Sequence, residues 1–167
     1  SYAGEEALTS IPSDMVDWVL VELRTAPDTV IERRAAILRR DGMLVDKPGQ
    51  AGLKFASAPG DYYIAIHHRN HLPVMTRDVV PVSGGMLYDF TDTLSLPVYG
   101  GCVIAMPGGA EAMIAGDINQ DGLLRYSGPL NDRVMILQRL VTETASNVLT
   151  NIVTGYFSED VSMDGRV

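Results

Sequence analysis

The sequence predicts a mainly β protein, an antiparallel β-sandwich of the Ig-like or jelly-roll-like kind, with a C-terminal appendage of loops and one helix. Short runs rich in β-branched and aromatic residues recur through the chain, and Gly- and Pro-containing pairs separate them. The clearest helical stripe of apolar residues begins after residue 131. The chain therefore divides into an extended N-terminal arm (1–14), a sandwich domain (15–116) and the appendage (117–167).

The first expected element is a core strand at residues 16–24. Its side chains alternate between two apolar faces, which is typical of a strand that is covered on both sides at its centre. One face carries Val19, Val21 and Leu23, and the other carries Trp18 and Leu20.

Residues 29–40 admit two interpretations. Apolar residues within this range lie at helical spacing, but the Asp41-Gly42 pair that follows, with a further apolar run at 43–45, is typical of a β-hairpin. We favour the hairpin.

Five further short strands are expected after this hairpin. The Pro59-Gly60 turn leads into the first of them, where the residue types again favour a strand. The five ranges are 62–68, 74–82, 86–91, 101–106 and 112–115.

The composition changes near Gly116. An apolar stripe from Val134 to Val141 predicts a helix over 133–141, with Asp132 placed to cap its N-terminus. Residues 142–156 are rich in Thr, Asn and β-branched residues, so both a strand and an irregular return fit them.

The composition also limits the class of partner. The chain has 167 residues, 46% of them hydrophobic, so a packed core is expected. The formal net charge of −8 argues against nucleic-acid binding and suits the binding of cations. No apolar run approaches the roughly 18 residues of a membrane helix. Cys102 is the only cysteine, which excludes an intrachain disulfide and a four-thiolate metal site, and we expect it to be buried.

The strongest chemical signal is the segment Asp117-Ile118-Asn119-Gln120-Asp121-Gly122-Leu123, which matches the first half of a calcium-binding loop, D-x-[DN]-x-[DN]-G-x. Ca²⁺ requires about six to eight oxygen ligands, which alternate side chains of a curled loop supply together. The expected ligands are the side chains of Asp117, Asn119 and Asp121 and the main-chain carbonyl of Leu123. The apolar Leu124 would anchor the loop to the core. The alternative interpretation is an Asp-, Asn- and Gly-rich turn that binds no metal.

The carboxylate that would close the ion's coordination shell departs from the EF-hand rule. That rule places it at the twelfth position of the loop, which is Gly128 in this chain. The next carboxylate along the chain is Asp132. We therefore expect Asp132 to be the closing ligand, at the start of the following helix.

A second, shorter copy of the motif begins at Asp160. Its ligands would be the side chains of Asp160, Ser162 and Asp164 and the carbonyl of Arg166. The segment that would supply a closing carboxylate is missing from this copy. The second loop would therefore bind Ca²⁺ weakly, or another part of the chain or a neighbouring molecule would complete it.

Two resemblances extend these inferences. Two such loops separated by a helix resemble dockerin type I modules in part. A longer set of motifs covers nearly the whole chain and resembles a module found toward the C-termini of large secreted Bacteroidota proteins. Its main motifs are Asp17-Trp18-Val19-Leu20-Val21-Glu22-Leu23-Arg24, His68-Arg69-Asn70-His71-Leu72, Tyr88-Asp89-Phe90-Thr91, Gly116-Asp117 and Tyr126-Ser127-Gly128 with Asn131-Asp132-Arg133. This resemblance implies export, a cell-surface setting and calcium, and it implies no known reaction.

The cluster of His67, His68 and His71 is the obvious place to suspect catalysis or a transition metal. On a strand, His67 and His68 point to opposite faces, and no Asp or Glu lies nearby in the sequence to orient either ring. A structural role is therefore expected, and Arg69 is expected to brace a turn through backbone carbonyls. The sequence also has no G-x-S-x-G, phosphate-loop or H-E-x-x-H motif, so we expect that the protein is not an enzyme.

These observations lead to one functional expectation and one alternative. The expected function is an extracellular structural or adhesive building block that calcium stabilises and that associates with copies of itself, head to tail in a filament, or with other cell-surface proteins. The alternative is a dockerin-like or carbohydrate-binding module of a larger secreted protein. Neither nucleic-acid binding nor membrane insertion is expected.

Overall fold

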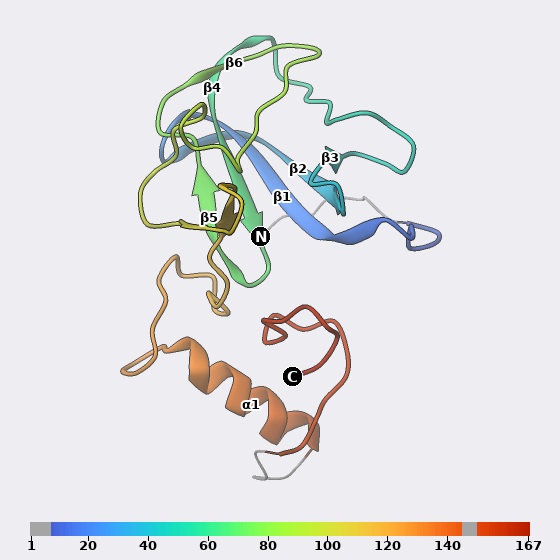
Figure 1. Ribbon diagram of the computed structural model, residues 1–167, viewed down its shortest axis with the longest axis vertical. Coiled ribbons are helices and arrows are strands. Elements are labelled where there is room, and N and C mark those ends of the chain that lie inside the picture. The colour runs from blue at the N-terminus through green and yellow to red at the C-terminus, as the bar shows by residue number, and fades with distance from the viewer. Residues whose placement is uncertain (1–7, 145–149) are drawn as a thin grey trace. The chain divides into compact units, whose positions relative to one another are not determined.

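The computed structural model describes residues 8–144 and 150–167 (Figure 1). Most of its regular elements are strands and one helix follows them, so the predicted mainly β class is confirmed. In chain order the elements are β1 (Met15–Ala26), β2 (Thr29–Arg39), β3 (Leu44–Val45), β4 (Gly60–His68), β5 (His71–Met75), β6 (Val80–Val82), β7 (Val103–Ala105), β8 (Glu111–Met113) and α1 (Asp132–Thr144). Of the expected N-terminal arm, residues 8–14 hold no strand or helix, and the rest lies outside the described residues.

The strands form one six-stranded sheet and one two-stranded sheet. Five strands of the larger sheet follow the order β3-β2-β1-β4-β5, and β6 pairs with β4; β7 pairs with β8. The pairings of β1 with β2 and with β4, of β2 with β3 and of β4 with β6 are all antiparallel. Figure 1 shows β1 lying between β2 and β4. The antiparallel sheet is thus confirmed, and a two-layer sandwich stays a prediction.

The predicted core strand at 16–24 is β1, which is paired along both of its edges. Val19, Val21 and Leu23 are buried on one face, as their alternation predicts, while Trp18 and Leu20 on the other face are half-buried. Full burial of such an apolar side chain contributes about 1.5–3 kcal/mol. This strand is therefore central to the apolar core of its unit.

The predicted hairpin is present, and the helical interpretation of residues 29–40 is wrong. β2 and β3 are joined by the turn that contains Asp41-Gly42, where Gly42 has a φ of 82°. Asp41 accepts a hydrogen bond from the backbone N–H of Met43 at 3.1 Å, which stabilises the turn. The cross-strand pairs of β2 with β1 set the alternation of side chains, so the apparent helical spacing has no structural meaning here.

The strand predicted at 74–82 is two separate strands, β5 and β6. The backbone N–H of Arg77 donates to the carbonyl of Pro97 at 2.8 Å, and this bond takes the chain out of the sheet between the two strands. The other predicted strands at 62–68, 101–106 and 112–115 correspond to β4, β7 and β8, with shifted or shorter bounds.

The strand predicted at 86–91 does not form. Asp89 accepts hydrogen bonds from the backbone N–H of Thr91 at 2.9 Å and from its hydroxyl at 2.7 Å. Such local side-chain bonds offer the backbone an alternative to a sheet ladder, and the apolar content of the segment did not reveal them. Residues 86–91 are therefore loop and turn.

The predicted helix at 133–141 is α1, but Asp132 does not cap it. The side-chain oxygen of Asn131 accepts the backbone N–H of Val134 at 3.0 Å, which is the N-cap contact. Asp132 is buried and directs its carboxylate away from the first turn of the helix, toward the loop that precedes it. Of the residues described within 142–156, 142–144 complete α1 and 150–156 form an irregular return.

The chain consists of two units. The first contains residues 1–68 and 73–112, and the second contains 69–72 and 113–167. The second unit thus includes the short turn between β4 and β5 together with the C-terminal part of the chain. Cys102 is buried in the first unit, as expected, and burial raises the pKa of its thiol. Within residues 8–144 and 150–167, no helix is long and apolar enough to span a bilayer.

Candidate metal centre

The segment at 117–123, called loop 1 from here, is tightly curled in the second unit. Gln120 and Gly122 both have positive φ values, of 59° and 77°. Gly adopts this conformation without steric cost, whereas a non-glycine residue such as Gln120 does so rarely. Two positive φ values within three residues reverse the chain and turn alternate side chains toward the inside of the loop.

The expected ligand side chains of loop 1 all bind backbone N–H groups of the same loop. The two carboxylate oxygens of Asp117 accept from Asp121 at 3.0 Å and from Gly122 at 3.1 Å. The side-chain oxygen of Asn119 also accepts from Asp121 at 3.0 Å, and Asp121 accepts from Leu123 at 3.0 Å. The structure therefore brings Asp117, Asn119 and Asp121 together around one curl of backbone.

Asp132 belongs to the same site. One of its carboxylate oxygens accepts the N–H of Ile118 at 2.9 Å, and the other accepts the N–H of Arg125 at 2.8 Å. The carboxylate of Asp132 thus holds the two ends of loop 1 together. Because each carboxylate oxygen has about two lone-pair sites, these two bonds leave acceptor capacity for an ion.

The electrostatics of loop 1 favour a cation. Asp117 is 1% exposed. Burial raises the pKa of the Asp117 carboxyl above its usual range, and the nearby carboxylates of Asp132 and Asp121 raise it further, despite hydrogen bonds from Gly122 and Asp121 that lower it. Arg125 is the cationic partner of Asp121 in this loop. Arg125 thus pairs with one carboxylate, while the charges of Asp121 and Asp132 both act on Asp117, so the loop carries excess negative charge.

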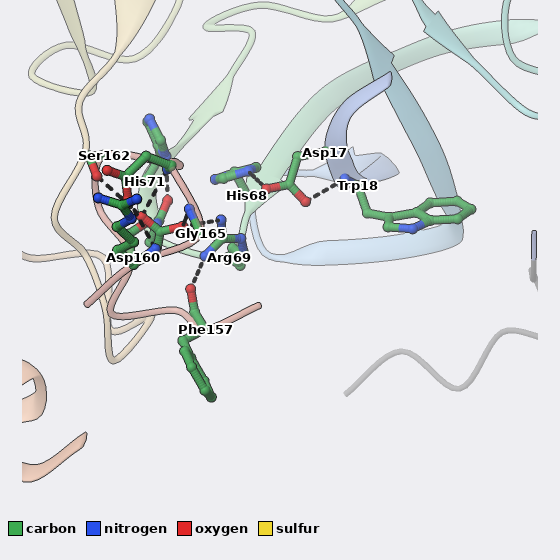
Figure 2. Close-up of polar contacts among 12 residues, drawn as sticks. Asp17, Trp18, His68, Arg69, His71, Phe157, Asp160, Ser162 and Gly165 are labelled. Atoms are coloured by element: carbon green, nitrogen blue, oxygen red, sulfur yellow. Dashed lines mark hydrogen bonds and ion pairs between the residues drawn. The ribbon is translucent and has the colours of Figure 1, made fainter. Parts of the chain in front are cut away.

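The second motif, at 160–166 and called loop 2 from here, has the same backbone conformation. Met163 and Gly165, which correspond to Gln120 and Gly122, have φ values of 56° and 82°. Asp160 is 2% exposed, and its two oxygens accept the N–H groups of Asp164 at 3.2 Å and Gly165 at 2.9 Å. Figure 2 shows Asp160, Ser162 and Gly165 gathered in this curl.

The two loops differ at the third position of the motif and at the closing position. Ser162 donates its hydroxyl to Asp160 at 3.3 Å, whereas Asn119 accepts a backbone N–H. Asp164 accepts the N–H of Arg166 at 3.0 Å, which is the counterpart of the bond from Leu123 to Asp121. The first, fifth and sixth positions therefore have matching contacts in both loops.

The donor set of loop 1 fits a hard cation such as Ca²⁺. Carboxylate, amide and carbonyl oxygens are the ligands that Ca²⁺ takes, and the side chains of Asp117, Asn119 and Asp121 with the carbonyl of Leu123 are of this kind. In the part of the chain that the structure describes, no three His, Cys, Asp or Glu side chains form a ready-made metal cluster. Leu124, expected to anchor loop 1 in the core, is instead 44% exposed. Its side chain lies over Gly116, where a Cβ would come within 3.3 Å of it.

The turn formed by Arg69 and Asn70 holds loop 2. Arg69 donates to the carbonyl of Phe157, as its expected role of bracing backbone carbonyls predicts, and its guanidinium lies 3.7 Å from the Asp160 carboxylate (Figure 2). Asn70 is fully buried, and its amide donates to the main-chain carbonyl of Asp160 at 2.6 Å. Loop 2 therefore already has a guanidinium beside its first carboxylate, which loop 1 does not have.

The histidines have acidic partners that were not found from the sequence. His67 lies 3.2 Å from Glu22 and His68 lies 3.0 Å from Asp17, in both cases from Nε2 to a carboxylate oxygen. Glu22 and Asp17 are on β1, next to β4, so they are neighbours in the sheet but distant in the chain. The signal that could have revealed them is the antiparallel register of the two strands, which pairs Val19 with His68 and Leu20 with His67. The Nδ1 atom of His71 lies 2.8 Å from the side-chain oxygen of Asn70.

No family model matches the chain, and no curated protein or solved structure matches it significantly.

Proposed function

We propose that the protein is an extracellular structural or adhesive building block whose C-terminal loops are held in shape by calcium. The observation that carries this proposal is that two separate loops with the same motif share the same curled backbone and the same hydrogen bonds to a buried first Asp. An Asp that is 1–2% exposed is costly to bury unless a cation or several hydrogen bonds compensate its charge. Bound Ca²⁺ supplies that compensation at loop 1.

Calcium suits the donors better than a transition metal does. The ligands of loop 1 are oxygens, the single cysteine lies in the other unit, and soft or imidazole ligands play no part in the motif. Ca²⁺ also accepts a flexible shell with main-chain carbonyls, whereas Mg²⁺ demands near-ideal octahedral geometry. Asp132 completes the shell of loop 1 in this proposal.

Loop 2 is the weaker site. Among the described residues, no carboxylate holds loop 2 as Asp132 holds loop 1, and the guanidinium of Arg69 already lies near Asp160. Its side-chain ligands are Asp160, Ser162 and Asp164, with the carbonyl of Arg166. A positive charge beside the first ligand reduces the affinity for a further cation.

The structural role rests on the organisation of the chain. An antiparallel sheet with a buried central strand supplies a rigid body, and we propose that its two sheets stack as a sandwich. The acidic composition and the one buried thiol suit an extracellular setting. Exposed apolar side chains on α1, at Val134 and Val141, and on the turn before it, at Leu130, favour association with copies of the same chain or with other surface proteins. Head-to-tail association of this kind produces a filament when the contact does not close on itself.

The second candidate function is a dockerin-like or carbohydrate-binding module. The matching geometry of the two loops, which precede and follow α1 in the chain, favours a dockerin-like module. The exposed rings of Tyr126 and Tyr156 favour a carbohydrate-binding module. Sedimentation with and without chelator distinguishes self-association from a monomeric module. A glycan array with added calcium tests the carbohydrate alternative.

The calcium proposal is tested by calorimetric titration and thermal unfolding of the whole chain. Calcium at 100 times its dissociation constant is expected to stabilise the second unit by about 2.7 kcal/mol, and EGTA is expected to reverse this. Asp121→Asn is expected to weaken binding strongly, because it removes a ligand charge but keeps the oxygen that accepts the N–H of Leu123.

The matched control is Asp41→Asn in the β2–β3 turn. Asp41 precedes a Gly of positive φ and accepts the N–H of Met43, as Asp121 does for Leu123, but it lies outside both calcium motifs and pairs with Arg39. Calcium binding by this variant should equal that of the wild type. A wild-type chain that takes up no calcium at millimolar concentration, or whose melting is indifferent to EGTA, would remove the proposal.

A further inference from the structure

One two-residue turn contacts both Asp loops. Arg69 and Asn70 connect β4 to β5 and belong to the same unit as loop 1 and loop 2. Asn70 is 0% exposed although its side chain is polar. Buried polar groups require hydrogen-bond partners, and Asn70 finds one at the start of loop 1 and another in loop 2.

The turn binds the start of loop 1 through its main chain. The N–H of Gly116, directly before Asp117, donates to the carbonyl of Asn70 at 2.7 Å. The side-chain amide of Gln120 donates to the carbonyl of Arg69 at 3.2 Å. Gln120 is the fourth residue of loop 1, with positive φ, so both the entry and the curl of the loop are attached to this turn.

The same turn binds loop 2 through its side chains. The amide of Asn70 donates to the main-chain carbonyl of Asp160 at 2.6 Å. Arg69 donates to the carbonyl of Phe157 and stacks over the ring of Tyr156, with 4.5 Å from the guanidinium carbon to the ring centroid. The segment before loop 2 (Tyr156 and Phe157) and the first expected ligand of loop 2 (Asp160) are thus bonded to the turn that also holds loop 1.

We propose that the Arg69–Asn70 turn couples the two loops, so that calcium bound by either loop raises the affinity of the other. This inference rests on the proposed function of the loops. When one loop binds an ion, its backbone becomes fixed, and this fixes the turn to which it is bonded. The other loop then loses less conformational freedom when it binds, and the two bindings are positively cooperative.

Asn70 is the residue through which the coupling acts most directly. Its main-chain carbonyl and its side-chain amide serve different loops, so a shift of loop 1 that moves the Asn70 backbone changes the bond to Asp160. The Oδ1 atom of Asn70 contacts His71, which restricts rotation of the amide. Asn70 is therefore a positioning residue and not a calcium ligand.

The test is a calcium titration by two-dimensional NMR, in which the amides of Gly122 and Gly165 report on loop 1 and loop 2 separately. Asp121→Asn weakens loop 1, the tighter site, and leaves the Arg69–Asn70 turn unchanged. Because loop 2 fills while loop 1 is already occupied, coupling is expected to make this substitution lower the affinity of loop 2 by about 5-fold or more, the usual range of such effects. In an Asn70→Ala background, the same substitution is expected to leave the affinity of loop 2 unchanged.

Reciprocity gives a second readout. Asp164→Asn in loop 2 is expected to lower the affinity of loop 1 as well, but by a smaller factor, because loop 1 is the tighter site and fills mostly while loop 2 is empty. In wild-type protein, saturation of loop 1 should also slow hydrogen exchange at the N–H of Val161 in loop 2. If Asn70 served only to support folding locally, binding at one loop would change neither the calcium affinity of the other loop nor the exchange rate of the Val161 N–H.

The outcomes separate this inference from the calcium proposal. If neither glycine amide shifts in wild-type protein at millimolar calcium, both proposals fail. If both loops bind calcium but Asp121→Asn leaves loop 2 unchanged, or lowers its affinity equally with and without Asn70, the coupling alone is overturned. If Asn70→Ala does not fold, Gln120→Asn decides: Gln120 is exposed, Asn tolerates positive φ, and the shorter side chain cannot reach Arg69. A coupling factor that this variant leaves undiminished contradicts the proposal.

Discussion

Glu22 is a buried carboxylate at the centre of β1 that three basic side chains surround. Arg33 donates to it from β2 at 2.7 Å, Arg24 donates at 2.8 Å, and His67 of β4 lies 3.2 Å away. Burial alone would raise the pKa of Glu22, but the hydrogen bonds from Arg33 and Arg24 and the charge of His67 outweigh it, so the pKa is lowered. Burial also lowers the pKa of His67, and Glu22 offsets only part of that effect.

Both shifts predict that acid destabilises the first unit. The ordinary pKa of Glu is 4.5, and in the folded chain the pKa of Glu22 lies below it. As pH falls through 4.5, the unfolded chain therefore takes up a proton that the folded chain resists, and the free energy of unfolding falls. His67 adds a fall of the same sign below its ordinary pKa of 6.5. Urea unfolding from pH 7 to pH 3, followed by the fluorescence of Trp18, measures both effects.

Glu22→Gln is expected to remove the step below pH 4.5 and to cost about 2 kcal/mol at pH 7, because charged hydrogen bonds to two arginines are weakened. Asp78→Asn is the control, since its pair with Arg77 is exposed, and it should change stability by less than about 0.5 kcal/mol. An unfolding free energy that is independent of pH between 7 and 3 would contradict this account of Glu22.

At the scale of elements, local chemistry decides which strands can be predicted. β1 and the β2–β3 hairpin follow from residue types and one Asp-Gly turn, so the sequence alone is sufficient for them. The prediction of a strand at 86–91 was wrong because Asp89 accepts hydrogen bonds from its near neighbour Thr91. The prediction of Asp132 as the helix N-cap was wrong because Asn131 and Asp132 are both good capping residues, and Asn131 is the one that caps. Only the position of loop 1, which binds the carboxylate of Asp132, decides between them.

The hairpin turn provides a direct test of one backbone conformation. Gly42 has a φ of 82° and no atom within 4 Å of an added Cβ, so Gly42→Ala creates strain without a clash. We expect it to cost about 1–2 kcal/mol. Gly84 also has open space, but its φ is not positive, so Gly84→Ala should be neutral or slightly stabilising. Equal stabilities of the two variants in urea unfolding would show that the conformation of this turn contributes nothing.

At the scale of the whole molecule, the pattern of the sequence predicted the class and the two candidate loops but not which distant segments meet. The ligand residues of loop 1 are close in sequence, so their motif was readable. The partners of His67 and His68, and the contacts of Arg69 with Phe157 and Asp160, join segments far apart in the chain. No periodicity or spacing within one segment reveals such pairs.

The proposed calcium binding and the division into two units together predict that removal of calcium has a regional effect. Hydrogen exchange measured with EGTA should accelerate at the amides that donate to Asp117 and Asp160, namely those of Asp121, Gly122, Asp164 and Gly165. Amides of β1 and β4 should keep their protection, because their hydrogen bonds and core lie in the first unit. Equal acceleration in β1 would mean that calcium acts on the chain as a whole.

Residues 69–72 belong to the second unit although they precede 73–112 of the first, and this limits which fragments of the chain can be expressed separately. A fragment that starts at 113 would lack the carbonyl of Asn70, which accepts the N–H of Gly116, and the side-chain amide of Asn70, which donates to the carbonyl of Asp160. A fragment that ends at 112 would retain Asn70, a side chain with no exposed surface in the intact protein, without those partners. Recombinant dissection at the apparent boundary would thus damage both pieces, and the undivided chain is the appropriate material.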